Sequence, residues 1–226
     1  MAEPTEGPTW LVASDPVACA ARCLVERLDA IAATAPTDAE EIRLAIPGGS
    51  ALAVALRAVA LLGERWRRVA LTWVDERCVP VDDPESNRGE AMRQGLLRLA
   101  PARIVPLFED GESPEAAIAR HARRWQAELR DGLDVALLGL GEDGHVASLF
   151  PARPWPRDGI AFHVADAPKP PASRISLTRA ALARARHTIL FATGEAKRPA
   201  LARLQAGDAS LPATGLPGLV VVTDRR

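Results

Sequence analysis

The feature that most constrains the fold is a regular alternation of short apolar segments with longer helical segments along all 226 residues. Residues 42–46 and 134–138, for example, are compact apolar runs, and the first is followed by an apolar-faced helical segment. Strands that alternate with helices of about 10–15 residues are typical of a mainly parallel sheet with helices on both faces. The sequence therefore predicts a three-layer α/β/α protein.

Capping residues and apolar periodicity set the expected boundaries. Asp15 and Ser113 are each followed by proline, a typical N-cap and first helical position. The expected strands are 42–46, 69–74, 104–108, 134–138, 162–165, 188–192 and 219–223, with a short strand-like segment at 175–177. The expected helices are 15–33, 50–62, 86–99 and 113–130, with helical stretches at 178–185 and 195–204. Residues 75–85 are expected to be a polar loop, and residues 1–9 a loose tail of a single domain spanning 1–226.

Composition argues against several classes of protein. A net charge of −1, from 28 basic and 29 acidic residues, disfavours a general nucleic-acid binder. The longest stretch without a charged residue is residues 209–223, which contains two prolines, so no membrane span is expected. The first basic residue is Arg22, which does not fit a signal peptide. The three cysteines are scattered and are expected to be reduced thiols, so the sequence predicts a cytoplasmic protein.

Ligands of parallel α/β sheets bind beyond the carboxyl ends of the strands, so the residues after each strand are the informative ones. Gly48, Gly49 and Ser50 follow the strand expected at 42–46. Glycines let the backbone approach a ligand closely, and the start of the next helix offers free N–H groups to an anion. Ser50 is expected to be both the helix N-cap and a hydroxyl donor. The alternative is an ordinary strand-to-helix turn.

Two further turns carry charged groups. Asp75, Glu76 and Arg77 follow the strand expected at 69–74, and such groups are costly to bury unless they are paired or used. Arg77 can bind a phosphate or carboxylate through two parallel hydrogen bonds, or form a structural pair with Asp75. Lys197 lies in the first turn of a helix, where a cation is unfavourable unless an anion is present. Arg174 is a second basic candidate, and solvated surface charges are the alternative for both.

The segment after 134–138 reads GLGEDGH and is the most informative of the chain. Its glycines match the dinucleotide pattern G-x-G-x-x-G, but that pattern needs a full crossover helix after the third glycine. Only residues 146–150 precede Pro151, which is too short. The preferred interpretation is a loop that presents Asp143 and His145 to a cleft, because histidine exchanges protons near neutral pH and a carboxylate can orient it. The alternative is a structural histidine, the interpretation preferred for the other three histidines.

Other catalytic signatures are missing from the sequence. There is no G-x-S-x-G nucleophile elbow and no His-x-x-x-His or Cys-x-x-Cys metal spacing. The residues alone therefore indicate a phosphorylated small molecule and acid–base chemistry that requires no metal.

Several blocks carry a family resemblance. Residues 75–80 (DERCVP) with 86–87, and residues 138–151 (LGLGEDGHVASLFP), resemble the signatures of the 6-phosphogluconolactonases. Residues 174–178 and 193–197 are similar to the later blocks of that family, in the same order. The resemblance covers essentially the whole chain. One departure is the first loop, where the family commonly has Ser-Gly-Gly-Ser-Thr-Pro and this chain has Pro47 and Ala51 at the first and fifth positions.

The resemblance implies a Rossmann-like fold of the sugar-phosphate isomerase type and hydrolysis of 6-phospho-D-glucono-1,5-lactone to 6-phosphogluconate in the pentose phosphate pathway, without a cofactor. His145 would be the general base, and Asp143 would orient it. The residues implied to contact the substrate are Gly48, Gly49, Ser50, Arg77 and Lys197 at the phosphate, with Asp75, Gly144 and Arg174 as further contacts. The role of Asp75 is either to contact sugar hydroxyls or to pair with Arg77.

The same resemblance leaves two other functions open. One is a glucosamine-6-phosphate deaminase or isomerase activity, since that sister family shares the Asp-Gly-His element. The other is a non-catalytic sugar-phosphate-binding protein, although such a protein would have no need of the Asp143–His145 pair. The expected partner is a phosphorylated sugar lactone, with no nucleic acid and no membrane, and the expected state is a monomer or small homo-oligomer.

Overall fold

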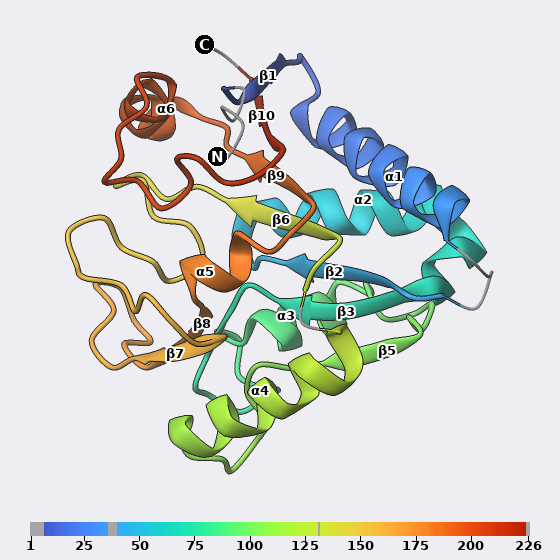
Figure 1. Ribbon diagram of the computed structural model, residues 1–226, viewed down its shortest axis with the longest axis vertical. Helices are drawn as coiled ribbons and strands as arrows, with labels where there is room; N and C mark the ends of the chain where they lie inside the picture. The colour runs from blue at the N-terminus through green and yellow to red at the C-terminus, as the bar shows by residue number, and fades with distance from the viewer. Residues whose placement is uncertain (1–6, 36–39, 131, 225–226) are drawn as a thin grey trace, which may run out of the picture.

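The computed structural model describes residues 7–35, 40–130 and 132–224. Within these ranges, seven strands form one sheet in which every neighbouring pair is parallel (Figure 1). In order across the sheet they are β1 (Thr9–Val12), β10 (Leu219–Thr223), β9 (His187–Phe191), β6 (Val135–Gly139), β2 (Ile42–Ile46), β3 (Val69–Trp73) and β5 (Arg103–Val105). The predicted mainly parallel α/β fold is confirmed.

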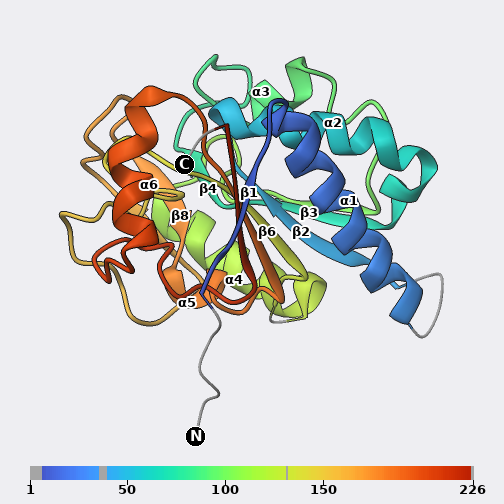
Figure 2. The same ribbon diagram turned by 90° about the horizontal axis from the view of Figure 1, so that it is seen from above.

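Helices cover both faces of this sheet because its central strands are apolar on both sides. Every residue of β3 and of β10 is buried. Helices α1 (Pro16–Thr34) and α2 (Leu52–Leu62) lie on one face, and α4 (Pro114–Leu129) and α5 (Arg179–Leu182) on the other (Figure 2). The other helical elements are α3 (Asn87–Arg93), α6 (Arg198–Gln205) and the 3₁₀ turns η1 (Gly49–Ala51), η2 (Gly63–Arg68) and η3 (Glu195–Lys197).

The helix starts follow the capping residues. The Asp15 side chain accepts a hydrogen bond from the Ala18 N–H at 3.0 Å, and that of Ser113 accepts one from the Ala116 N–H at 3.2 Å. These two predicted starts are confirmed. The helix expected at 86–99 ends instead at Arg93. Gly95 has a φ of +83°, a left-handed conformation that stops a helix.

A second, antiparallel sheet was not predicted from the sequence. It consists of β4 (Asp75–Arg77), β8 (Arg174–Leu177) and β7 (Ala161–Val164), in that order. The expectation that residues 75–85 are entirely loop is therefore wrong at its first three positions. A three-residue strand made only of charged side chains has no apolar alternation to reveal it. Its register places Arg77 opposite Arg174, so the two arginines lie on adjacent strands.

The edge strand β1 was also missed. Thr9, the last residue of the expected tail, pairs with Val220 of β10, whereas residues 1–6 lie outside the described part of the chain. Half of β1 is exposed, so its apolar signal is weak. None of the helices in the described ranges is long and apolar enough to cross a membrane.

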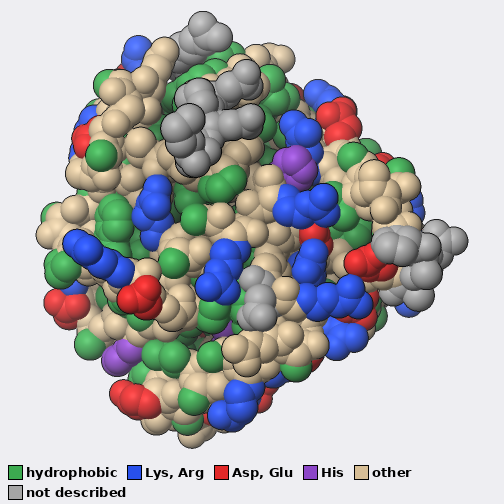
Figure 3. Space-filling model, viewed as in Figure 1, with side chains coloured by type: hydrophobic (Ala, Val, Ile, Leu, Met, Phe, Trp, Pro, Cys, Tyr) green, Lys and Arg blue, Asp and Glu red, His purple; other side chains and the backbone are tan. Residues whose placement is uncertain are grey.

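An ion pair joins the start of β2 to the residue directly before β6. Arg43 on β2 donates two parallel hydrogen bonds to the Asp134 carboxylate, at 2.7 and 2.8 Å, and Arg186 approaches the same carboxylate at 3.6 Å. Arginine side chains gather beside these strand starts, among the blue side chains to the right of centre in Figure 3. Burial raises the pKa of Asp134, but hydrogen bonds from Arg43 outweigh it and leave the pKa below its usual value. This cluster lies at the opposite end of the sheet from the strand ends that carry the candidate site.

Candidate active site

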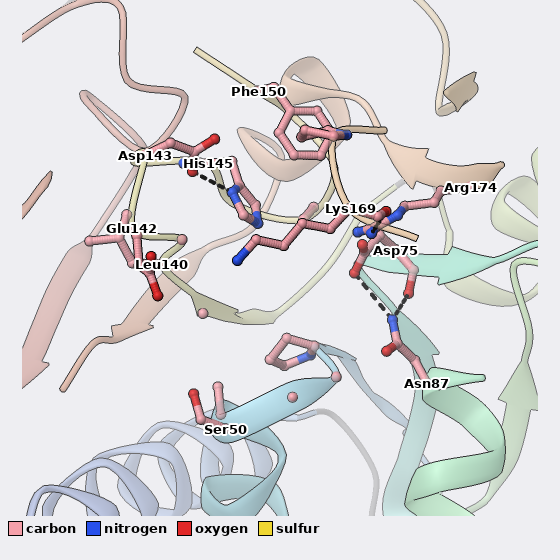
Figure 4. A pocket seen from close by; sticks show the side chains of 18 of the residues that line it. Ser50, Asp75, Asn87, Leu140, Glu142, Asp143, His145, Phe150, Lys169 and Arg174 are labelled. Carbon is pink, nitrogen blue, oxygen red and sulfur yellow. Dashed lines mark hydrogen bonds and ion pairs between the residues drawn. The ribbon is translucent and has the colours of Figure 1, made fainter. Parts of the chain in front are cut away.

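The order of the strands creates a crevice between β2 and β6. From β2 the chain moves through β3 to β5 in one direction, whereas β6, β9 and β10 extend in the other. The loops after β2 and β6 therefore diverge at their carboxyl ends, which is where open α/β sheets bind ligands. A cavity of about 510 Å³ lies there (Figure 4). Nine of the ten predicted site residues line it, namely Gly48, Gly49, Ser50, Asp75, Arg77, Asp143, His145, Arg174 and Lys197.

The loop after β6 holds Asp143 and His145 against each other. An Asp143 carboxylate oxygen lies 2.5 Å from His145 Nδ1, and the same oxygen accepts the His145 backbone N–H at 3.1 Å (Figure 4). The loop is closed by a hydrogen bond of 2.8 Å from the Gly141 N–H to the His145 carbonyl. Because Nδ1 is engaged by the carboxylate, Nε2 is the ring nitrogen left to exchange a proton in the cavity.

The surroundings keep Asp143 ionised. Partial burial raises the pKa of Asp143, but hydrogen bonds from the His145 ring and backbone lower it further, so that the pKa lies below its usual value. The Phe150 ring packs beside the imidazole, with centroids 4.9 Å apart and planes inclined by 46°. The carboxylate and the aromatic ring together fix the orientation of His145. Such a pair is suited to general acid–base chemistry.

Two glycines of this loop occupy positions where a larger residue would not fit the loop conformation. A Cβ added to Gly141 would lie 2.1 Å from His145 Nδ1 and 2.7 Å from an Asp143 oxygen. Gly144 has a φ of +93°, and a Cβ there would lie 2.5 Å from Leu211. Gly144 is not among the residues that line the cavity, so it shapes the loop. Residues 140–160, all of them described, contain no helix, in agreement with the rejection of a dinucleotide fingerprint.

The turn after β2 differs from the prediction at Ser50. The turn starts with η1, and α2 begins only at Leu52, with Gly48 and Ala51 as the respective N-caps. Neither cap makes a side-chain hydrogen bond, so the expectation that Ser50 caps the helix is wrong. Ser50 is exposed within η1 and lines the cavity, which leaves its hydroxyl available to a ligand. Gly48 is required here because a Cβ would lie 1.9 Å from the Asn87 side chain.

Asp75 is held by neighbours that the sequence interpretation gave no role. Its carboxylate accepts a hydrogen bond from Ser148 Oγ at 2.7 Å. The same carboxylate accepts one from Asn87 Nδ2 at 3.4 Å (Figure 4). Asn87 also donates to the Asp75 backbone carbonyl at 2.9 Å. No ion pair joins Asp75 to Arg77 within the described chain, so the alternative of a structural Asp75–Arg77 pair is wrong. Both Asn87 and Ser148 lie inside the recognised sequence blocks, and that position was the only signal for them.

Glu76 organises the segment that carries these groups. It is only 3% exposed and accepts the backbone N–H groups of Arg77, Asn87 and Arg88 at 2.7–2.8 Å. Burial raises the pKa of Glu76, and the three N–H donors oppose that rise. The side chain therefore fixes the start of α3 against β4 and places Asn87 beside Asp75. The role of Glu76 is structural.

Four cationic side chains line the cavity. Lys197 donates a hydrogen bond to the Leu140 carbonyl, and burial lowers its pKa, with Glu142 opposing. Arg77 donates to the Glu85 carbonyl. Arg174, only 6% exposed, donates to the carbonyls of Lys169 and Pro171 at 2.7 and 3.0 Å.

Lys169 is the fourth of these cations and was not predicted as a site residue. The signal that could have found it is composition, because Lys169 and Lys197 are the only lysines of the chain. Among the described residues, no group of three or more His, Cys, Asp or Glu side chains is placed to hold a metal ion. The cavity therefore combines a carboxylate–imidazole pair with cations suited to a phosphorylated ligand.

Comparison with known sequences connects this arrangement to characterised proteins. The family model for glucosamine-6-phosphate isomerases/6-phosphogluconolactonase matches residues 15–221. A 6-phosphogluconolactonase of Mycobacterium leprae is 36% identical over 212 residues, covering 86% of this chain and 85% of the relative. Another, from Caulobacter vibrioides, is 37% identical over 172 residues, covering 71% and 72%.

Solved structures share the fold. A 6-phosphogluconolactonase from Thermotoga maritima superposes with a TM-score of 0.82 at 23% identity, covering 96% of this chain and 98% of that one. A monomeric glucosamine-6-phosphate deaminase superposes with a TM-score of 0.77 at 16% identity, with 96% of each chain covered. The fold is therefore common to lactonases and deaminases, and the choice between these activities depends on the sequence relatives and on the site.

Proposed function

This chain belongs to the glucosamine-6-phosphate isomerase/6-phosphogluconolactonase family, and on that premise we propose that it hydrolyses 6-phospho-D-glucono-1,5-lactone to 6-phosphogluconate, with His145 as the general base. The observation that carries the proposal is the Asp143–His145 pair, joined at 2.5 Å and set in one cavity with a glycine turn and several cations. The chain is thus a lactone hydrolase of the oxidative pentose phosphate pathway.

The reaction proceeds in two steps. His145 Nε2 takes a proton from a water molecule as the water oxygen attacks C1 of the lactone, and the carbonyl electron pair moves to the carbonyl oxygen. The tetrahedral intermediate then re-forms the C=O bond and breaks the C1–O5 bond. Protonated His145 gives its proton to O5, which becomes the 5-hydroxyl of the product. Asp143 keeps the ring oriented and stabilises the imidazolium formed between the steps.

The substrate is held by its 6-phosphate. Arg77, Lys197, the Ser50 hydroxyl and the amides of residues 48–50 are the groups we assign to it. The lowered pKa of Lys197 reflects a partly buried ammonium, and a phosphate dianion would offset the cost of burying that charge. Asp75, fixed by Asn87 and Ser148, is assigned to the sugar hydroxyls.

Coupled production of the lactone tests the activity. Glucose-6-phosphate dehydrogenase generates the lactone in situ, and its disappearance is followed with and without this protein, because the lactone also hydrolyses spontaneously. We expect clear acceleration by the protein and no ammonia release from glucosamine 6-phosphate. Ammonia release without lactone hydrolysis would identify a deaminase, and binding without either reaction would identify a sensor.

Replacing His145 by alanine tests the assigned base. We expect kcat to fall by about 10²–10⁴-fold, with KM changed by less than about threefold, because a general base acts on the transition state. His187→Ala, at the start of β9, is the control histidine and should retain wild-type kcat. A His145→Ala enzyme with near-normal kcat would remove His145 as the base.

The cellular setting completes the proposal. The three cysteines lie within the described ranges and are free thiols, as is usual in a reducing compartment. We therefore place the reaction in the cytoplasm, carried out by a monomer or small homo-oligomer whose residues 1–226 act as one domain.

A further inference from the structure

Lys169 extends from the loop between β7 and β8 into the cavity. In Figure 4 its side chain extends across the cavity towards the His145 ring and Leu140. The residue is exposed, and among the described residues its ammonium has no hydrogen-bond or ion-pair partner. Such a side chain on an open surface would be an ordinary solvated lysine. Its position inside a cavity that contains the reacting histidine sets it apart.

The backbone that carries Lys169 is fixed from two sides. Arg174, almost fully buried on β8, donates hydrogen bonds to the carbonyls of Lys169 and Pro171. The Ala167 N–H donates to the Ala172 carbonyl at 2.9 Å and closes the loop. Two of the three nitrogen atoms of the Arg174 guanidinium, Nε and Nη2, therefore donate to the backbone of the loop that carries Lys169. This arrangement makes Arg174 a positioning residue for Lys169 as well as part of the cavity wall.

We propose that Lys169 contacts the C1 end of the substrate and stabilises the negative charge that develops on its carbonyl oxygen. The inference rests on the proposed lactone hydrolysis. Attack of water on C1 places an oxyanion beside His145, and a cation aimed at that charge accelerates the step. Lys197 already donates to Leu140 and Arg77 to Glu85, whereas Lys169 is uncommitted and directed towards His145.

The product also carries negative charge at C1. Hydrolysis leaves a carboxylate at C1 of 6-phosphogluconate, so an ammonium that faces C1 also binds the product. Glucitol 6-phosphate has the same phosphate and the same hydroxyls at C2 to C5 but a neutral alcohol at C1. The difference in affinity between these two ligands therefore reports on the group that faces C1, independently of turnover.

Calorimetric titration of wild type and Lys169→Met with both ligands tests the assignment. We expect the substitution to weaken 6-phosphogluconate about tenfold or more, as for loss of a charge-assisted hydrogen bond, and glucitol 6-phosphate less than about twofold. Lys197→Met is the matched control, and it should weaken both ligands equally because Lys197 is assigned to the phosphate. Retained binding of glucitol 6-phosphate also shows that the Lys169 variant is folded.

Kinetics supply the second readout. Lys169→Met should lower kcat about tenfold or more with little change in KM, and Lys169→Arg should recover most of kcat because it restores the charge. Equal weakening of the two ligands would place Lys169 at the phosphate and overturn the inference, while leaving lactone hydrolysis by the wild type intact. Unchanged binding and kcat would also overturn it. If the wild type itself fails to accelerate lactone hydrolysis, the proposed function fails, and with it this inference.

Discussion

Replacing Gly141 by alanine places a methyl group where the Asp143–His145 pair now lies. The added Cβ would be 2.1 Å from His145 Nδ1 and 2.7 Å from an Asp143 oxygen, whereas ordinary contact begins at 3.4 Å. The φ of Gly141 is not positive, so alanine causes no backbone strain there. The substitution therefore acts on the catalytic pair alone.

The size of the effect follows from this overlap. The imidazole must move by about 1.3 Å to reach ordinary contact, the difference between 3.4 and 2.1 Å. A misplacement of about 1 Å can cost about 10²-fold in rate, which corresponds to about 2.7 kcal/mol of activation free energy. Because the pair is partly exposed, the displaced ring can turn towards solvent, and we expect the free energy of unfolding to change by less than about 1 kcal/mol.

Gly139→Ala is the matched control in the same segment. A Cβ at Gly139 would lie 3.5 Å from the Ala51 side chain, an ordinary contact, and its φ is not positive either. The lactonase assay should show kcat reduced about 10²-fold for Gly141→Ala and nearly unchanged for Gly139→Ala, with urea unfolding alike for both. The reasoning is refuted if Gly141→Ala keeps more than half of the wild-type kcat, or if the Gly139 variant loses as much activity.

Three further predictions concern the fold and the phosphate. Burial lowers the pKa of His121 to about 4 in the folded protein, whereas its imidazole in the unfolded chain has a pKa near 6.5. The unfolded state therefore binds a proton first, and the free energy of unfolding should fall by about 3 kcal/mol as the pH drops from 6.5 to 4. In urea unfolding, the free energy of unfolding of His121→Leu should fall by about 3 kcal/mol less than that of the wild type over this pH range. An identical fall in both proteins would exclude His121 as the source of the pH dependence. The pKa of Asp134 is lowered in the folded protein, so the ionised carboxylate stabilises the fold at pH values above its usual pKa, near 3.9. This stabilisation is lost as the pH falls through the pKa of the folded state. Asp134→Asn should cost about 2–4 kcal/mol at pH 7, whereas Glu64→Gln, at an exposed ion pair, should cost less than about 1 kcal/mol; equal costs would contradict this. Arg77→Ala and Lys197→Ala should each raise KM about tenfold or more with a smaller change in kcat, and unchanged KM values would place the phosphate elsewhere.

The central architecture and the main site loop could be predicted because their signals are local. The central strands of the sheet are covered by helices on both faces, so nearly every residue in them must be apolar whatever the pairing register. The apolar runs that mark them are β2, β3, β6, β9 and β10. The carboxyl ends of parallel strands share one edge of the sheet, so the turns after β2, β3, β6 and β9 are expected from the sequence to lie close together. Asp143 and His145 are two residues apart, so their contact follows from a single glycine-rich turn.

What the sequence could not decide depends on contacts between distant segments. The second sheet forms because β4 pairs with β8, and neither strand alone has enough apolar alternation to reveal the pairing. In the sequence Glu76 is one charged residue of a polar turn, and only the tertiary structure shows that three backbone N–H groups donate to its carboxylate.

The sequence by itself determined the layered fold, the edge of the sheet that carries the site, and the Asp143–His145 pair. Only the tertiary structure placed Asn87 and Ser148 on Asp75, and Arg174 behind the Lys169 loop. The physical reason is the range of the interactions. Periodicity, capping and glycine conformation act over a few residues, whereas a hydrogen bond between side chains of remote segments exists only once packing has brought them together.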